Sequence, residues 1–195
     1  MHTVSWIPTF EINFWNAWIL TLFMVLHPLI MNLVDKTVGT GNINKKMGDV
    51  QAEKGKKKSL PIPTVLLIVL FLYSIFLPLK LGTAWFYTGI AIYLVGIVMF
   101  LSSIITVSKT PMDQIFSRGM YRYSRHPLYL SFLFTFVGVS VASASWLFLL
   151  LSMGWMVFPI SQVTSEEQDC LKSFGNEYQE YMNTTSKWLG LPKSK

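Results

Sequence analysis

Residues 83–107 read TAWFYTGIAIYLVGIVMFLSSIITV, an uncharged and mostly apolar run of 25 residues. A helix that crosses a bilayer needs about 20 predominantly apolar residues, so this run predicts a membrane-spanning helix. The composition agrees, because 52% of the 195 residues are hydrophobic and only 13% are charged. A soluble domain carries about 25% charged residues and leaves roughly 30% of its unfolded surface exposed at this length. A soluble fold of this size could not bury so much apolar surface.

Four other apolar runs flank this one and predict an all-α, polytopic membrane helix bundle with five transmembrane helices. The expected spans are residues 14–34, 60–79, 83–107, 127–142 and 146–163. Pro28 and Pro159 lie inside two of them and predict kinks. Such a bundle uses nearly the whole chain, so residues 1–195 are expected to form a single integral membrane domain. With one cysteine, Cys170, no intramolecular disulfide and no multi-cysteine metal site are expected.

The basic residues predict the orientation of the bundle. Fifteen of the 16 lysines and arginines fall on one side of the expected membrane, and only Lys80 falls on the other. The positive-inside rule then puts the N-terminus outside and the C-terminus in the cytoplasm. The net charge of +6 indicates contact with anionic lipid headgroups rather than nucleic acid, and the lysine-rich loop 35–59 is expected to touch these headgroups.

The first stretch with chemical potential is RGMYRYSRHPLY, residues 118–129. Pro127 suits the first position of a helix, and the backbone N–H groups that follow attract a carboxylate or a phosphate. Arg125 and His126 stand beside this anion site, while Tyr121, Tyr123 and Tyr129 offer flat faces to a purine or a cation. The alternative is a plain helix start with interfacial tyrosines, and the residues alone do not decide between the two.

The second stretch is TSEEQ, residues 164–168, at the end of the fifth expected span. Carboxylates near hydrocarbon are costly and tend to be functional, and Glu166 or Glu167 would suit an ammonium or a sulfonium group. The alternative is two solvated acids just past the membrane edge. Because residues 143–145 form a short connection, the fourth and fifth spans are expected to form a hairpin that brings both stretches to one pocket. That pocket would suit a zwitterionic, nucleotide-like ligand.

Three motifs in order are similar to a known family. Gly119-x-Tyr121-x-x-x-Arg125-His126-Pro127-x-Tyr129, Glu166-Glu167 and Phe174-Gly175-x-x-Tyr178-x-x-Tyr181 resemble the C-terminal core of isoprenylcysteine carboxyl methyltransferases. Related membrane phospholipid methyltransferases share this core. The resemblance covers residues 106–190, the expected catalytic core, and the length is similar to that of short prokaryotic members. It implies S-adenosylmethionine as the methyl donor and a reaction that needs no metal.

The resemblance also implies a set of cofactor contacts and a class of substrate. Carried over by position, the cofactor-binding residues are Gln114, Ile115, Phe116, Tyr121, His126, Pro127, Leu128, Tyr129 and Glu167, with Glu167 holding the amino group. No residue is assigned a catalytic role. The acceptor implied is the carboxylate of a lipid-borne, prenylcysteine-like substrate that enters laterally from a cell membrane or endomembrane. The cofactor would enter from the cytoplasmic face. Eukaryotic members carry a substrate-assigned arginine where this chain has Val163, so the acceptor stays open.

Three other functions remain open from the sequence. A phospholipid N-methyltransferase would need a base to deprotonate its amine, and Glu166 is the spare acid. A membrane reductase similar to sterol reductases would bind a dinucleotide, although the chain has no glycine-rich fingerprint for one. A non-enzymatic scaffold would leave the order of the three motifs unexplained. Finally, apolar residues at helical spacing over 171–182 predict an amphipathic helix, either docked or acting as a lid.

Overall fold

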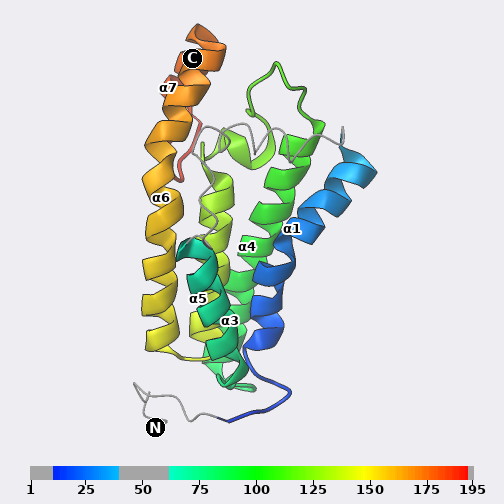
Figure 1. Cartoon of the computed structure of the whole chain (residues 1–195), viewed down its shortest axis with the longest axis vertical. Coiled ribbons are helices and arrows are strands. Elements are labelled where there is room, and N and C mark those ends of the chain that lie inside the picture. The colour runs from blue at the N-terminus through cyan, green and yellow to red at the C-terminus, as the bar shows by residue number, and fades with distance from the viewer. Residues whose placement is uncertain (1–10, 40–61, 193–195) are drawn as a thin grey trace. The chain divides into compact units, whose positions relative to one another are not determined.

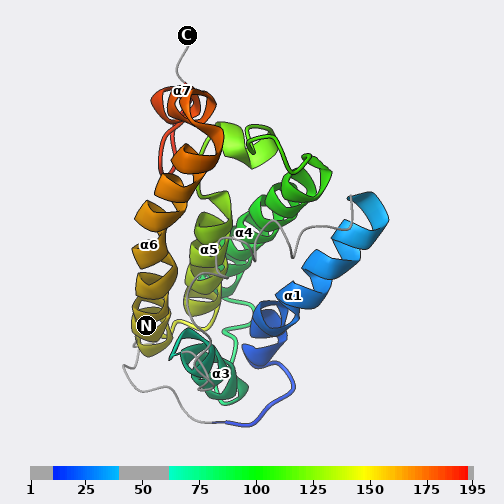
Figure 2. The same ribbon diagram turned by 45° about the horizontal axis from the view of Figure 1, so that its top comes forward.

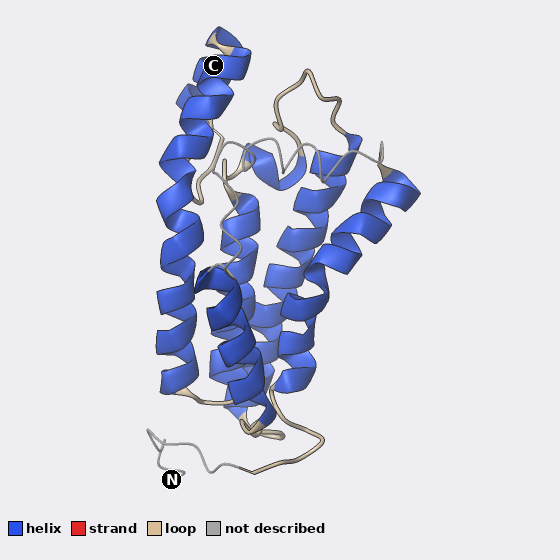
Figure 3. Ribbon diagram, in the orientation of Figure 1, coloured by secondary structure: helices blue, strands red, loops and turns tan. Residues whose placement is uncertain are grey.

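The computed structural model describes residues 11–39 and 62–192, and the regular secondary structure in these ranges is entirely helical (Figure 3). Six α-helices follow one another along this part of the chain (Figure 1). They are α1 (Trp18–Val38), α3 (Ile62–Ile75), α4 (Ala84–Lys109), α5 (Pro127–Ala142), α6 (Trp146–Phe174) and α7 (Asn176–Thr184). A short 3₁₀-helix, η1 (Gly119–Arg122), lies between α4 and α5. The all-α prediction is confirmed for the described residues.

Three of the described helices, α1, α4 and α6, are long and apolar enough to cross a membrane. The other two apolar helices are shorter, with 14 residues in α3 and 16 in α5. A helix of 16 residues rises about 24 Å, less than the ~30 Å thickness of the hydrocarbon core. Three of the five predicted spans therefore correspond to described helices with the length and composition of a membrane span, and the crossing itself remains a prediction. The expected headgroup contacts of loop 35–59 fall, from position 40 onward, outside the described residues.

The first two predicted spans were wrong at the ends that approach each other. The first was expected to begin at Phe14, but α1 begins at Trp18, and α3 ends at Ile75 rather than near Leu79. The cause is a short backbone pairing between the two connecting segments. The N–H of Ala17 donates to the carbonyl of Leu77, and the N–H of Leu79 donates to the carbonyl of Trp15. The side chain of Asn16 also donates to the carbonyl of Ile75 at 2.7 Å, which caps the end of α3.

The predicted boundary between the fifth span, residues 146–163, and the amphipathic helix, residues 171–182, was also wrong. The helix α6 continues through Val163 to Phe174, so Glu166 and Glu167 lie inside a helix rather than past its end. It stops at Gly175, whose φ of +54° is easy for glycine and strained for other residues. Consequently the amphipathic segment expected over 171–182 belongs partly to α6 and partly to α7, which buries Tyr178 and Tyr181.

The described chain forms two compact units. Unit 1 comprises residues 11–27, 62–97 and 131–158, and unit 2 comprises residues 28–39, 98–130 and 159–192. The boundaries inside α1 and α6 fall at Pro28 and Pro159, the two prolines within helices. A proline removes one intrahelical hydrogen bond, so these are the points where each helix is weakest. The kinks expected there remain predictions.

Within unit 1, the helices α4 and α5 lie side by side in both views (Figures 1 and 2). A Cβ atom placed on Gly89 would lie 2.2 Å from the backbone nitrogen of Ala142, and one on Gly138 would lie 2.6 Å from that of Tyr93. The two backbones therefore touch, because glycine leaves no side chain between them. A hydrogen bond of 2.9 Å from the Tyr93 hydroxyl to the Leu20 carbonyl also connects α4 to α1.

Unit 2 contains the residues singled out by the sequence motifs. It includes the end of α4, the loop and η1 that follow it, the start of α5, the end of α6, and α7 with the residues after it. Gly119 begins η1 with a φ of +57°, and a Cβ there would lie 2.7 Å from the Thr106 hydroxyl of α4. Glycine therefore lets the chain return closely along α4 before it enters α5.

Candidate functional site

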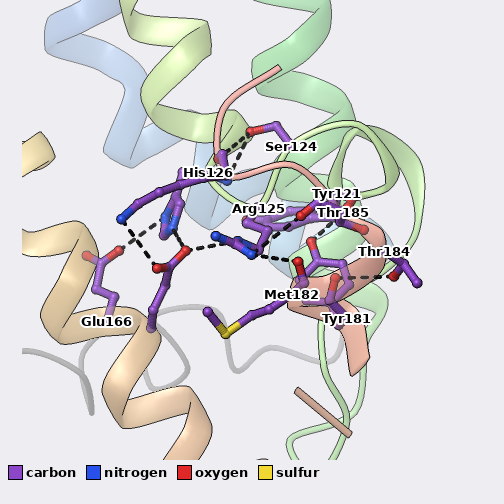
Figure 4. A network of polar contacts seen from close by, with 11 residues as sticks. Tyr121, Ser124, Arg125, His126, Glu166, Tyr181, Met182, Thr184 and Thr185 are labelled. Carbon is purple, nitrogen blue, oxygen red and sulfur yellow. Dashed lines mark hydrogen bonds and ion pairs between the residues drawn. The ribbon is translucent and has the colours of Figure 1, made fainter. Parts of the chain in front are cut away.

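The His126-Pro127 junction starts α5 as predicted, and Ser124 organises it. The buried Ser124 hydroxyl accepts a hydrogen bond of 3.0 Å from the backbone N–H of His126. Pro127 then occupies the first helical position, where a missing N–H costs nothing. This short turn directs the side chains of Arg125 and His126 toward the acids of α6 (Figure 4).

A buried carboxylate, that of Glu167, is the centre of the site. The residue is 6% exposed, and its Oε1 lies 2.9 Å from Arg125 Nε and 3.2 Å from His126 Nε2. Its other oxygen, Oε2, lies 3.4 Å from the ammonium of Lys187. Burying a carboxylate is costly unless cations and hydrogen-bond donors surround it, and three such groups are present here.

Arg125 is held by the backbone of the C-terminal region as well as by its acid. Its Nη1 donates to the carbonyls of Met182 and Thr185 at 2.9 and 3.4 Å (Figure 4). Both carbonyls lie at the C-terminal end of α7, where the last turn leaves acceptors unpaired. The Nε of Arg125 approaches Glu167 as an ion pair without the geometry of a hydrogen bond. Arg125 therefore has a structural role that connects α6 with α7.

The second acid, Glu166, faces a different pair of side chains. Its Oε1 accepts a hydrogen bond from the Tyr129 hydroxyl, and its Oε2 lies 3.6 Å from His126 Nδ1. The rings of His126 and Tyr129 are stacked, with centroids 5.8 Å apart and planes inclined by 5°. The imidazole of His126 thus lies between the two acids, with one nitrogen facing each.

His126 is a neutral donor in this arrangement. Burial has the largest effect on the pKa of its imidazole and lowers it below the ordinary value. The hydrogen bond and the charge of Glu167 come next in size and raise the pKa, whereas the smaller effects of Arg125 and Lys187 lower it, so burial decides the net direction. A neutral imidazole carries one N–H, and only the tautomer protonated at Nε2 can donate to Glu167.

The residues after α7 return along the loop that precedes α5. We name residues 185–190 the C-terminal strap. Its backbone accepts from the N–H of Arg125 at Ser186, at 3.0 Å, and donates from Gly190 to the Tyr123 carbonyl, at 2.9 Å. The Trp188 ring lies 6.0 Å from the His126 ring. The strap therefore lies directly beside the buried acid cluster.

The helix α7 is fastened to the same loop by tyrosines. The Tyr181 hydroxyl donates to the Tyr121 carbonyl at 2.7 Å (Figure 4). Burial raises the pKa of Tyr181, so this hydroxyl stays protonated and remains a donor. Tyr178 and Tyr181 are both buried, with ring centroids 5.7 Å apart. The Tyr178 and Tyr181 positions of the third motif are thus accounted for by packing within unit 2.

Most of the predicted cofactor-binding residues come together in unit 2. Those within the described cluster or its supporting turn are Tyr121, His126, Pro127, Leu128, Tyr129 and Glu167. Phe116 joins them through its ring, 5.5 Å from that of Tyr121. Gln114 is exposed and closes a turn on Pro111, and Ile115 is half-buried; neither is among the residues labelled in Figure 4. Their roles in binding a cofactor remain predictions.

Sequence reasoning missed three contributors to the cluster. Arg125 was expected only to stand beside an anion site, yet it pairs with Glu167 and caps α7. Lys187 and Trp188 were not singled out for the site at all. No local signal identifies them, because their approach to Glu167 and His126 depends on the turn at Gly175 and on the return of the strap.

The described residues are thus helical, with three helices long and apolar enough to cross a membrane and an acid cluster at the start of α5. The phospholipid methyltransferase family matches residues 80–177, half of the chain. The chain belongs to this family, which is related to the isoprenylcysteine enzymes that the motifs resemble. The matched region includes His126, Pro127, Glu166 and Glu167. No curated protein matches the chain significantly.

Proposed function

We propose that this chain transfers a methyl group from S-adenosylmethionine to a lipid-borne acceptor, with residues 1–195 forming one integral membrane domain and residues 106–190 its catalytic core. The observation that carries the proposal is the contact between His126 and Glu167. These residues are 41 positions apart and meet in a buried cluster at the start of a helix. Members of the phospholipid methyltransferase family generally use this cofactor.

The residues of the cluster fit a zwitterionic cofactor. The first turn of α5 presents backbone N–H groups and the positive end of the helix dipole, which suit the carboxylate of the cofactor. Glu167 suits its amino group, because an ammonium, that of Lys187, already lies 3.4 Å from this carboxylate. Phe116 and Tyr121 supply aromatic faces for the adenine. The same residues were assigned to the cofactor from their positions in the motifs.

The protein's work in such a reaction is alignment and exclusion of water. When bound, S-adenosylmethionine supplies the methyl group from a positively charged sulfonium. Holding donor and acceptor in line contributes about 7–11 kcal/mol to lowering the barrier. Burial lowers the pKa of His126, so its imidazole does not add a positive charge beside the sulfonium. Glu167 and the α5 N-terminus would hold the two ends of the amino-acid moiety and thereby fix its direction.

For the acceptor, we propose the carboxylate of a prenylcysteine-like lipid that enters laterally between helices. Such a nucleophile is already ionised and needs no general base, and the motif resemblance supports it. A phospholipid amine is the second candidate, which the family match favours. Its ammonium must lose a proton before attack. Glu166 is the candidate base, because it is the spare acid once Glu167 is assigned to the cofactor; it accepts from the Tyr129 hydroxyl and lies 3.6 Å from His126 Nδ1.

We also propose five spans with the C-terminus in the cytoplasm, which puts the acid cluster on the cytoplasmic face of a cell membrane or endomembrane. The charge asymmetry of the sequence supports this orientation. A membrane-impermeant maleimide tests it on two single-cysteine variants made in a Cys170→Ser background. Leu81→Cys should react in intact cells, whereas Ser173→Cys should react only after permeabilisation. The opposite pattern would reverse the orientation.

The function is tested by calorimetric binding of S-adenosylhomocysteine to the detergent-purified protein. Glu167→Gln should weaken binding by about 10- to 150-fold, the equivalent of a hydrogen bond between charged groups at ~1.5–3 kcal/mol. Glu177→Gln, at an exposed position of α7, is the matched control and should bind normally. Thermal melts of each variant establish that it is folded. A folded wild-type protein that does not bind would refute the proposed cofactor.

A further inference from the structure

The two oxygens of Glu167 have different kinds of partner. Oε1 faces Arg125 and His126, which belong to the turn that starts α5. Oε2 faces Lys187, which belongs to the C-terminal strap. The Arg125 side chain is only 10% exposed, whereas that of Lys187 is 37% exposed. One side of the carboxylate is thus held by buried groups, and the other by a partly solvated lysine.

Arg125 and Lys187 also differ in how firmly they are fixed. The guanidinium of Arg125 donates to two carbonyls at the end of α7, so it cannot leave without disturbing that helix. The side chain of Lys187 has four rotatable carbons and a single described ion pair. Its ammonium can therefore move away from Glu167 at a small cost, since a partly exposed ion pair contributes little.

The strap that carries Lys187 is attached by a small number of backbone contacts. Beyond Ser186, the described contacts are the bond from Gly190 to Tyr123 and a long one of 3.4 Å from the Ser124 hydroxyl to the Lys187 carbonyl. After Thr185, whose N–H still donates to the Tyr181 carbonyl, the described strap residues 186–190 belong to no helix. Trp188 lies near His126 and is 36% exposed. Residues 187–190 can therefore separate from the cluster while α7 stays in place.

We propose that Lys187 is an internal substitute for the cofactor's ammonium: it neutralises Glu167 in the cofactor-free protein and is displaced, with strap residues 187–190, when the cofactor binds. This inference rests on the proposed function, because it assumes that Glu167 holds the amino group. Two ammonium groups cannot share Oε2 without repulsion. The strap conformation described here is then the one that competes with the cofactor. The apparent affinity for the cofactor is then the intrinsic affinity multiplied by the fraction of molecules in which Lys187 has left Glu167.

The test compares two ligands on three proteins. S-adenosylhomocysteine carries the amino-acid ammonium, and 5′-methylthioadenosine has the same nucleoside without it. Lys187→Gln should bind S-adenosylhomocysteine about two- to fivefold more tightly than the wild type, the range expected for a partly exposed ion pair. Its affinity for 5′-methylthioadenosine should be unchanged. Lys172→Gln, which removes an exposed lysine paired with Asp169, should change neither affinity.

Amide hydrogen exchange at Gly190 gives a second readout, because its N–H donates to Tyr123 in the strapped conformation. Exchange should become faster when S-adenosylhomocysteine binds to the wild type, and should not change with 5′-methylthioadenosine. Weaker binding of S-adenosylhomocysteine by Lys187→Gln, or slower exchange on binding, would mean that the strap holds the cofactor, and would overturn the inference. Equal affinity would overturn it while leaving the proposed function intact. Absence of binding by every folded protein would refute both.

Discussion

The guanidinium of Arg125 joins two helices that are separated by the turn at Gly175. Its Nε lies 2.9 Å from Oε1 of Glu167 in α6, and its Nη1 donates to the carbonyl of Met182 in α7 at 2.9 Å. The arginine of the Arg125-His126-Pro127 motif therefore fixes the shape of the site. This contact explains how a turn before α5 can depend on residues more than 40 positions later.

Replacing Arg125 by Gln should destabilise the protein strongly. The substitution leaves the buried Glu167 carboxylate without its closest cation and removes two bonds to the end of α7. Breaking a buried ion pair by removing one partner costs about 3–5 kcal/mol. The free energy of unfolding in detergent measures this loss. Arg122→Gln, at an exposed position of η1, is the control and should change stability by less than about 0.5 kcal/mol. Similar losses in both variants would contradict the structural role of Arg125.

The stability of the protein should depend on His126 between pH 7.5 and 5.5. Its pKa is lowered from 6.5 in the folded protein, so below pH 6.5 the unfolded chain binds more protons than the folded one. Stability therefore falls as the pH falls through this window. The titratable and charged groups that face the ring are Glu166, Glu167, Arg125 and Lys187. Thermal melts of His126→Gln should show a smaller pH dependence than the wild type. Identical slopes would exclude His126 as the cause.

Local signals predicted the start and the end of α5 correctly. Pro127 marks a first helical position by its own chemistry, and residues 143–145 make a short connection to α6. The end of α6 was predicted wrongly, because the loss of hydrophobicity after Val163 was taken as the end of the helix. Hydropathy reports where a membrane ends, whereas a helix continues until its backbone is interrupted. Here the interruption is Gly175.

The candidate site was predictable only as far as the motifs reached. His126 and Glu167 were assigned to one pocket from a hairpin argument and from the motif order, and they do meet. Lys187 could not be assigned, because nothing near it in the sequence specifies that the strap turns back toward Glu167. The bridge between Asn16 and Pro78 that shortened the first two predicted helices is equally non-local. Patterns of composition and spacing do not predict contacts of this kind, between segments that are far apart in the sequence.

Two helical glycines of unit 1 should respond differently to replacement by alanine, because only Gly138 lies at the contact between α4 and α5. Gly138→Ala adds a Cβ that would lie 2.6 Å from the Tyr93 backbone nitrogen, so the helices must separate. Overpacking of this kind costs about 1–3 kcal/mol. Gly154→Ala, in α6, meets no atom within 4 Å among the described residues and should be neutral or slightly stabilising, since alanine favours a helix by up to ~1 kcal/mol. Thermal melts in one detergent compare the two. Equal melting temperatures would show that the α4–α5 backbone contact is loose.

The two candidate acceptors differ in their need for a base, and Glu166 separates them. If the acceptor is a carboxylate, Glu166→Gln should keep methyl transfer within a few-fold of the wild type at saturating cofactor, because no proton must be removed. If it is a lipid amine, the same variant should lose about 10²–10⁴-fold, the usual contribution of general base catalysis. Radiolabelled methyl transfer to a prenylcysteine analogue and to phosphatidylethanolamine in vesicles measures both. Tyr129→Phe removes the hydroxyl that donates to Glu166, so it should change the rate of transfer to the amine and leave transfer to the carboxylate unchanged. We expect the protein to methylate the carboxylate, and this activity to survive in Glu166→Gln. If the protein instead methylates the amine, and this activity disappears in Glu166→Gln, the phospholipid is the substrate and Glu166 is its base.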